Sequence, residues 1–193
     1  MKKSITILSL IAGMFFMTAF TPVKDDIYTV DIERSTIEWS AKKVGGGHTG
    51  AVKITDGTLV YSGKALKSGN FQMNMSSITS DNARLTTHLK SDDFFSTEKN
   101  PMSKFEITKV VAAGTDRVNI TGNLSIKGFT HSITFPATVK QQKGVIVAVA
   151  SGIRVDRTKY DIKFRSKTFF GDIGDKAIDD EFVLNINLTA KKG

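Results

Sequence analysis

The chain contains 193 residues, no cysteine, and a formal net charge of +8. The absence of cysteine excludes a disulfide-stapled scaffold, so the fold must be held by its hydrophobic core. The lysines are scattered rather than gathered into a basic and aromatic patch, so we expect no binding to nucleic acid and interpret most of them as solvated faces or protection of strand edges.

The first twenty residues have the layout of a secretory signal peptide. Met1-Lys2-Lys3 is basic, and the apolar run from Ile5 to Phe20 is shorter than the roughly 20 residues that a membrane-spanning helix needs. We therefore predict a cleavable signal peptide at about 1–20 and a periplasmic or secreted location, with an uncleaved N-terminal anchor as the alternative. The remaining residues suffice for one domain, which we place at 27–191.

Most of the remaining chain alternates between apolar and polar residues, which is typical of antiparallel strands with one wet face. Turn signals separate these runs, among them Asp56-Gly57, Ser62-Gly63 and Lys127-Gly128. Strands are predicted at 28–33, 35–44, 48–55, 58–76, 104–113, 115–126, 129–141, 144–155 and 181–191. The 58–76 run can also be two strands divided near Gly63 or Gly69. So many amphipathic strands must hide their apolar faces, so we predict an all-β fold with a single antiparallel eight-stranded barrel; a two-sheet sandwich is the alternative.

Two segments break the alternation. Residues 81–90 read as one short helix that Ser80 or Asp81 can cap, with Leu85 and Leu89 on one face. A helix placed between strands in this way is typical of a plug or lid at one end of a barrel. Residues 156–180 place several aromatic side chains among many charges and are predicted to form a long rim loop, where binding loops are common.

Three further patterns do not indicate catalysis, a metal or a cofactor. The run Gly45–Gly50 matches G-x-G-x-x-G, but a predicted strand follows instead of the helix that a nucleotide site requires. A cluster of four aspartates (Asp172, Asp175, Asp179 and Asp180) lacks calcium-loop spacing and is interpreted as a solvated turn. The three histidines show no ligand spacing, and no nucleophile motif is present. We therefore expect a protein that is not an enzyme and has no metal site.

The order and spacing of several short motifs resemble the YceI family over about residues 27–191. The matching motifs are Tyr28-Thr29-Val30-Asp31, His48-Thr49-Gly50, Ser77–Ser80, His88-Leu89-Lys90-Ser91, Asp93-Phe94-Phe95 with Pro101 and Phe105, Gly122–Gly128, Asp156-Arg157 and Ile173-Gly174-Asp175. The resemblance implies a lipocalin-like barrel with an apolar pore, export to a bacterial periplasm, and binding of a polyisoprenoid or similar amphiphile. It also implies that the head-group candidates Arg84 and His88 lie near the pore mouth. Many members carry charged residues where this chain has Leu85-Thr86-Thr87, which weakens Arg84 as a head-group contact.

An eight-stranded barrel is just wide enough to fill itself with side chains or to hold one slender ligand. The chain contains 13 phenylalanines, and flexible methionines suit an adaptable lining. The candidate pore-lining residues are Trp39, Phe71, Met73, Met75, Leu85, Phe94, Phe95, Phe105, Phe135 and Phe164. An ordinary filled core is the alternative interpretation of each of these side chains.

The predicted function is that of a carrier or sequestering protein for an isoprenoid lipid or quinone, held as cargo rather than as a cofactor. The alternative is a periplasmic interaction or stress-related module with a filled core and no bound lipid. A membrane-bound partner and a homodimer are compatible with either prediction.

Overall fold

The computed structural model describes residues 24–171 and 173–193. The predicted signal peptide at 1–20 lies outside the described residues. The strands are β1 (Asp25–Val30), β2 (Thr36–Lys43), β3 (Gly46–Ser62), β4 (Ala65–Ser80), β5 (Met102–Ala112), β6 (Arg117–Ile126), β7 (Phe129–Gln142), β8 (Val145–Asp156) and β9 (Ile178–Lys192). The helices are α1 (Ala83–Lys90) and α2 (Lys167–Phe170), and the 3-10 turns are η1 (Ile32–Arg34), η2 (Arg157–Tyr160) and η3 (Gly174–Lys176).

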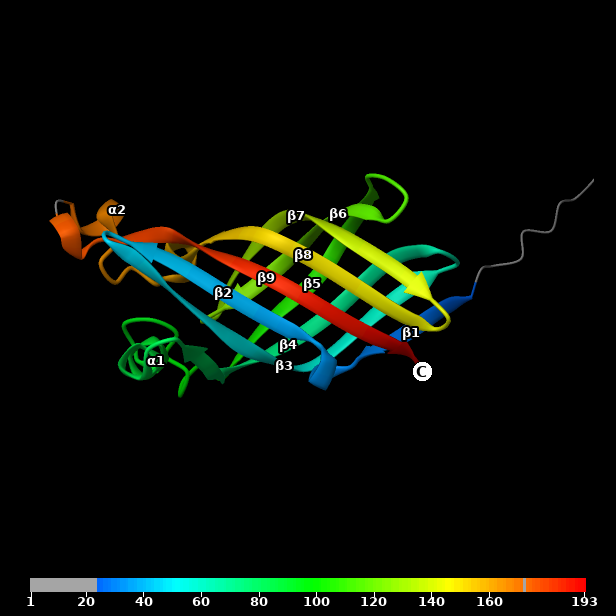
Figure 1. The fold of residues 1–193 in the computed structure, drawn as a ribbon, viewed down its shortest axis with the longest axis horizontal. Coiled ribbons are helices and arrows are strands. Elements are labelled where there is room, and N and C mark those ends of the chain that lie inside the picture. Colours follow the sequence, from blue (N-terminus) through cyan, green and yellow to red (C-terminus); the bar gives the residue numbers. More distant parts are fainter. Residues whose placement is uncertain (1–23, 172) are drawn as a thin grey trace, which may run out of the picture.

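The strands form one antiparallel sheet that closes on itself (Figure 1). Neighbours run in the order β2-β9-β8-β7-β6-β5-β4-β3, and β3 pairs again with β2. The short strand β1 pairs with the second half of β3 and the end of β9. The strands β1 and β2, which η1 separates in the chain, therefore occupy one strand position of the barrel between them. The predicted all-β, eight-stranded barrel is therefore confirmed, and closure pairs the strand edges that an open sheet would expose.

One predicted turn is wrong. Strand β3 runs through Asp56-Gly57, and the chain reverses at Gly63, which has a left-handed φ of 62°. Gly57 has no such φ; a Cβ built there would lie 2.6 Å from Val30 Cγ2 and 3.0 Å from Phe71 Cδ1. The glycine is therefore required for close packing inside the barrel, and it resembles a turn signal only in the local sequence. The alternative division of the 58–76 run near Gly63 is confirmed.

The predicted helix forms, but it begins at Ala83 and Asn82 is its N-cap. The Asn82 side chain accepts a hydrogen bond from the Leu85 amide at 2.9 Å. Asp81 instead binds β3, since its carboxylate accepts hydrogen bonds from His48 Nδ1 at 2.9 Å and from the Thr49 amide at 3.3 Å. The start of α1 is therefore tied to β3 by Asp81, one of the two residues that the sequence offered as a cap.

The two ends of the barrel differ. Both helices lie at one end, here called the helical end, together with the β2–β3 and β6–β7 turns (Figure 1). The β3–β4, β5–β6 and β7–β8 turns and the C-terminus lie at the other, the hairpin end. The predicted rim loop connects β8 to β9 at the helical end and contains η2, α2 and η3; residues 157–177 are called the rim segment below.

The barrel wall is incomplete between β7 and β8. Their pairing covers Thr138–Gln142 with Val145–Val149, and among the described residues the earlier part of β7 pairs with β6 alone. The rim segment fills this gap: His131 Nε2 donates to the Lys159 carbonyl at 2.8 Å, and its ring packs edge-on against Tyr160 at 5.2 Å. Tyr160 is fully buried, so the rim segment is part of the wall as well as a loop.

In the described part of the chain, no helix combines the length and the apolarity required to cross a membrane.

Adding a methyl group at Gly57 is expected to strain the packing of β3. We expect Gly57→Ala to lower the free energy of unfolding by about 1–3 kcal/mol, because the new Cβ collides with Val30 and Phe71. Urea denaturation measures the effect. Val30→Ala should destabilise the native chain but cost little in the Gly57→Ala background, and simple additivity of the two changes would contradict this packing.

Alkaline pH should weaken the fold through two buried phenols. Burial raises the pKa of Tyr61 to about 12, and burial likewise raises the pKa of Tyr160 to about 12. The unfolded chain loses these protons near pH 10, so it binds fewer protons than the folded chain, and stability falls as the pH rises from about 10 to 12. Urea denaturation across this range should show a shallower fall for a Tyr61→Phe/Tyr160→Phe variant; an unchanged slope would contradict the assignment.

Candidate functional site

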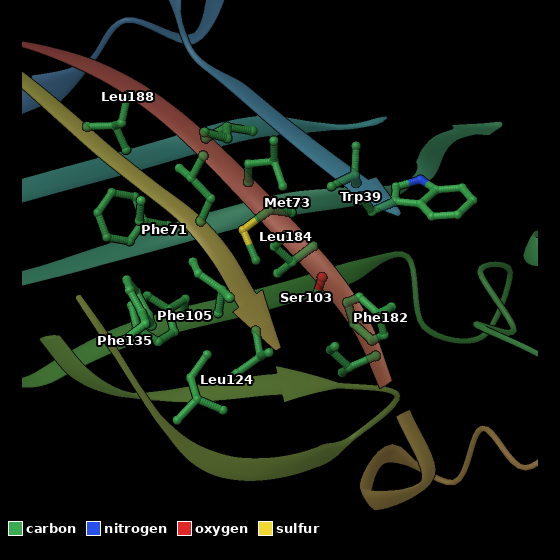
Figure 2. A pocket seen from close by; sticks show the side chains of 18 of the residues that line it. Trp39, Phe71, Met73, Ser103, Phe105, Leu124, Phe135, Phe182, Leu184 and Leu188 are labelled. Carbon is green, nitrogen blue, oxygen red and sulfur yellow. The ribbon is translucent and has the colours of Figure 1, made fainter. Parts of the chain in front are cut away.

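The barrel interior contains an apolar cavity of about 190 Å³ (Figure 2). Strands β2 through β9 and α1 all contribute side chains to its wall. For comparison, an engineered cavity of about 150 Å³ lined by aliphatic and aromatic groups stays dry and admits benzene. The cavity is therefore large enough to hold an apolar group, and its apolar wall offers water few hydrogen-bond partners.

Polar atoms near the cavity have partners within the protein. Ser103 Oγ donates to the sulfur of Met75 at 2.8 Å, and the indole N–H of Trp39 donates to the Thr79 carbonyl at 3.0 Å. Arg157, which also borders the cavity, directs its guanidinium to backbone carbonyls. A ligand inside would thus be held by apolar contact and shape rather than by hydrogen bonds.

Eight of the ten predicted lining residues border the cavity. They are Trp39, Phe71, Met73, Met75, Phe94, Phe95, Phe105 and Phe135. Figure 2 shows Phe71, Phe105 and Phe135 together on one side of the cavity, with Trp39 towards the other. The structure places these side chains correctly for contact with a ligand, and their role in lipid binding stays a prediction.

The other two predicted lining residues lie outside the cavity. Leu85 borders a surface hollow, because only the last turn of α1 reaches the interior, through Leu89. Phe164 comes from the rim segment and packs against the cavity-lining Phe94, with its ring centroid 5.3 Å from that of Phe94. Helical spacing alone cannot tell which of Leu85 and Leu89 faces inward, since both lie on one face of α1.

Sequence reasoning missed much of the aliphatic lining. It favoured aromatic and methionine side chains, whereas the wall also contains many branched residues, including Ile37, Ile54, Ile107, Ile120, Leu124, Ile126, Ile133, Leu184, Ile186 and Leu188. The apolar–polar alternation along each strand could have identified these residues, because every inward position of a small closed barrel faces the same interior.

Next to the cavity, the helical end has a cationic hollow. It is lined by Lys43, His48, Asn82, Arg84, Leu85, His88 and Arg165. No carboxylate is among these residues, and in the described chain no carboxylate lies within 4.0 Å of Lys43, Arg84 or Arg165. The hollow therefore brings together Arg84 and His88, whose contact with a head group stays a prediction, and adds two cations from β2 and the rim segment.

His88 links the cationic hollow to the cavity wall. Its ring packs edge-on between Phe94, at 4.9 Å, and Phe164, at 4.8 Å between centroids, while its Nε2 lies 2.9 Å from Asp93 Oδ2. The guanidinium of Arg165 lies over the Phe164 ring at 5.1 Å. A cation–aromatic stack thus separates the cationic hollow from Phe94, which borders the apolar interior.

The rim segment is organised by one buried cation, Arg157. Its guanidinium donates to the carbonyls of Ile162 and Phe164 at 2.9 Å, and of Ile178 and Asp179 at 3.0 Å. It also lies 3.3 Å from Asp180. Burial lowers the pKa of Arg157, and the negative charge of Asp180 opposes this shift. The guanidinium thus joins both ends of the rim segment.

The histidines and acidic residues do not gather into a site. In residues 24–171 and 173–193, no group of three or more histidines and carboxylates could hold a metal ion. Gly45 lies in the turn before β3 and Gly46 is the first residue of β3, both with positive φ values, and Asp180 is engaged by Arg157 and Thr168. These glycines and this carboxylate therefore have structural roles.

Comparison with protein families gives a match to the YceI-like domain over residues 28–190. Over 142 residues the chain is 32% identical to a UPF0312 protein of Pseudomonas aeruginosa, a match that covers 71% of this chain and 72% of that protein. The protein YceI of Escherichia coli O157:H7 is also 32% identical over 142 residues, with the same shares of both chains.

Two solved structures share the fold. Burkholderia cenocepacia BcnA superposes with a TM-score of 0.72 at 19% identity, covering 84% of this chain and 99% of that chain. A polyisoprenoid binding domain from Saccharophagus degradans, implicated in plant cell wall breakdown, gives 0.67 at 14% identity, with 86% and 98% covered. At these identities the likeness shows a common fold.

Replacing Arg157 by lysine should loosen the rim segment. The planar guanidinium of Arg157 donates hydrogen bonds to four carbonyls, and a lysine ammonium cannot reproduce this geometry. We therefore expect Arg157→Lys to cost at least about 2 kcal/mol of stability. Hydrogen exchange should accelerate in the rim segment. The matched control is Arg154→Lys, whose exposed partner is Glu181 at 2.7 Å and whose effect should stay below about 0.5 kcal/mol. Equal effects of the two changes would contradict the role given to Arg157.

Proposed function

Because the chain belongs to the YceI-like domain family, we propose that it binds a lipid with an apolar chain, of the isoprenoid or quinone class, inside the barrel. The observation that carries the proposal is the apolar cavity on the barrel axis, which has no unsatisfied polar group in its wall. The polyisoprenoid binding domain that shares this fold supports the same class of ligand.

The size and lining of the cavity indicate how such a chain is held. Burial of each methylene contributes roughly 0.8 kcal/mol, so one five-carbon unit contributes on the order of 3–4 kcal/mol before losses. At about 190 Å³ the cavity accepts a short length of chain as it stands. A longer chain requires the lining to move, and Met73 and Met75 have the rotamer freedom to do so.

The cationic hollow suggests the orientation of the ligand. With the apolar chain in the cavity, the polar end of an amphiphile would lie at the helical end near Arg84, His88 and Arg165. Arg84 and Arg165 carry positive charge and donate hydrogen bonds, so this end suits an oxygen-rich or anionic head group. This orientation follows from the distribution of polarity along the barrel.

We further propose that the protein acts as a carrier or sequestering protein outside the cytoplasm rather than as an enzyme. The cavity wall contains no titratable side chain with a free polar atom, because Arg157 is saturated by carbonyls. The basic and apolar N-terminal sequence supports export. Binding and release, rather than bond making, are what such an interior can perform.

Filling the cavity should abolish lipid binding. Ala150 borders the cavity from β8, so Ala150→Phe should occupy the space that the lipid chain needs and weaken binding at least about tenfold, with a stability cost of about 1–3 kcal/mol. The matched control is Val147→Phe on the same strand, where the side chain is exposed and binding should not change.

Native mass spectrometry of protein from its own envelope fraction, with organic extraction of the cargo, measures the outcome. A stoichiometric isoprenoid or quinone adduct in the native protein and the Val147→Phe control, but not in Ala150→Phe, is the expected result. A native protein that is empty and rejects added polyprenyl lipids and quinones would overturn the proposal and favour the interaction module.

A further inference from the structure

The helical end exposes two adjacent phenylalanines. Phe169 and Phe170 on α2 have exposed fractions of 49% and 58%, and all four residues of α2 are exposed. In Figure 1, α2 lies at the helical end, close to the β2–β3 turn. Large aromatic rings are normally buried in a core, so the exposure of both rings at the helical end calls for a physical reason.

Hydrogen bonds around α2 hold the helix that carries these exposed rings. Ser166, fully buried, accepts hydrogen bonds at its carbonyl from the amides of Phe169 and Phe170, and Thr168 Oγ1 donates to Asp180 at 2.7 Å. Val44, between β2 and β3 at the same end of the barrel, is also exposed, and its amide donates to the Ala177 carbonyl at 3.4 Å. The two exposed rings, Phe169 and Phe170, are called the apolar tip.

Cations surround the apolar tip. Residues 157–176 contain six basic and three acidic side chains. Lys163 Nζ lies 4.9 Å from the centre of the Phe169 ring. Arg165 and Lys167 are exposed, and in the described chain neither has a carboxylate within 4.0 Å. Lys163 also pairs with Asp161 at 2.7 Å, which leaves Arg165 and Lys167 as the two of these three cations without a carboxylate partner in the described chain.

We propose that the apolar tip docks the helical end onto the surface of a bilayer that contains anionic lipid. Aromatic rings flanked by lysine and arginine match the interface, where rings enter the boundary with the acyl chains and cations remain among phosphates. A stable protein partner needs roughly 1,000 Å² of complementary surface, whereas two half-exposed rings supply about a third of that at most. The charge and the small apolar area therefore favour a membrane.

Docking in this orientation would place the ligand site beside the bilayer. Arg165 borders the cationic hollow and stacks on Phe164, which packs on the cavity-lining Phe94. A lipid leaving the bilayer would therefore meet the helical end first. This consequence rests on the proposed function, whereas docking itself does not.

The test is a local fluorescence measurement on the full chain carrying Phe170→Trp. With vesicles of phosphatidylglycerol and phosphatidylcholine, we expect a blue shift and quenching by brominated acyl chains, beyond the signal of buried Trp39 in the parent chain. Both effects should be weak with phosphatidylcholine alone and should fall as salt is raised to about 0.5 M, because salt screens the cations. Absence of quenching would overturn the proposal.

A matched pair of variants tests the rings themselves. Phe169→Ser/Phe170→Ser should weaken vesicle binding at least about tenfold in co-sedimentation, while Ile27→Ser, equally exposed at the hairpin end, should leave it unchanged. Equal binding by both variants, or binding to envelope membranes but not to protein-free vesicles, would overturn the proposal, the latter in favour of a protein partner. Cargo retention by the Phe169→Ser/Phe170→Ser variant in native mass spectrometry separates a failure of docking from a failure of lipid binding.

Discussion

Closure of the sheet through β3 and β4 is the constraint on which the rest of the structure depends. These strands pair along nearly their whole length, from Gly50 with Ser80 to Ser62 with Ala65. Every other strand presents an apolar inner face that an open sheet would leave in water, so closure gives all of them a common interior. Because eight strand positions enclose slightly more space than their side chains fill, the same closure creates the cavity.

Arg157 has a comparable role at the helical end. A buried cation is costly unless every donor finds an acceptor, and the carbonyls of the rim segment and of β9 supply them. The rim segment can therefore adopt few other arrangements while Arg157 stays buried. This fixes Phe164 against Phe94 and Tyr160 in the gap between β7 and β8, so one side chain positions both part of the wall and the surroundings of the cationic hollow.

The polarity of the molecule changes along the barrel axis. The interior is apolar, and the helical end carries both the cationic hollow and the apolar tip with its flanking cations. An amphiphilic lipid has the matching distribution of apolar chain and polar head, and a bilayer surface has a matching order of phosphates and acyl chains. The proposed cargo and the proposed docking surface thus both depend on the same change in polarity from the barrel interior to the helical end.

The sequence alone predicted the strands, the short helix and eight of the side chains in the cavity wall, because alternation is local and the inward positions of a closed barrel all face one interior. It could not identify Gly57, whose role is set by contact with Val30 from another strand, nor choose between Leu85 and Leu89. Nor could it show that Arg157 is buried or that Phe169 and Phe170 are exposed. Tertiary structure decided these features, since burial, cavity volume and the meeting of charges depend on which distant segments pack together.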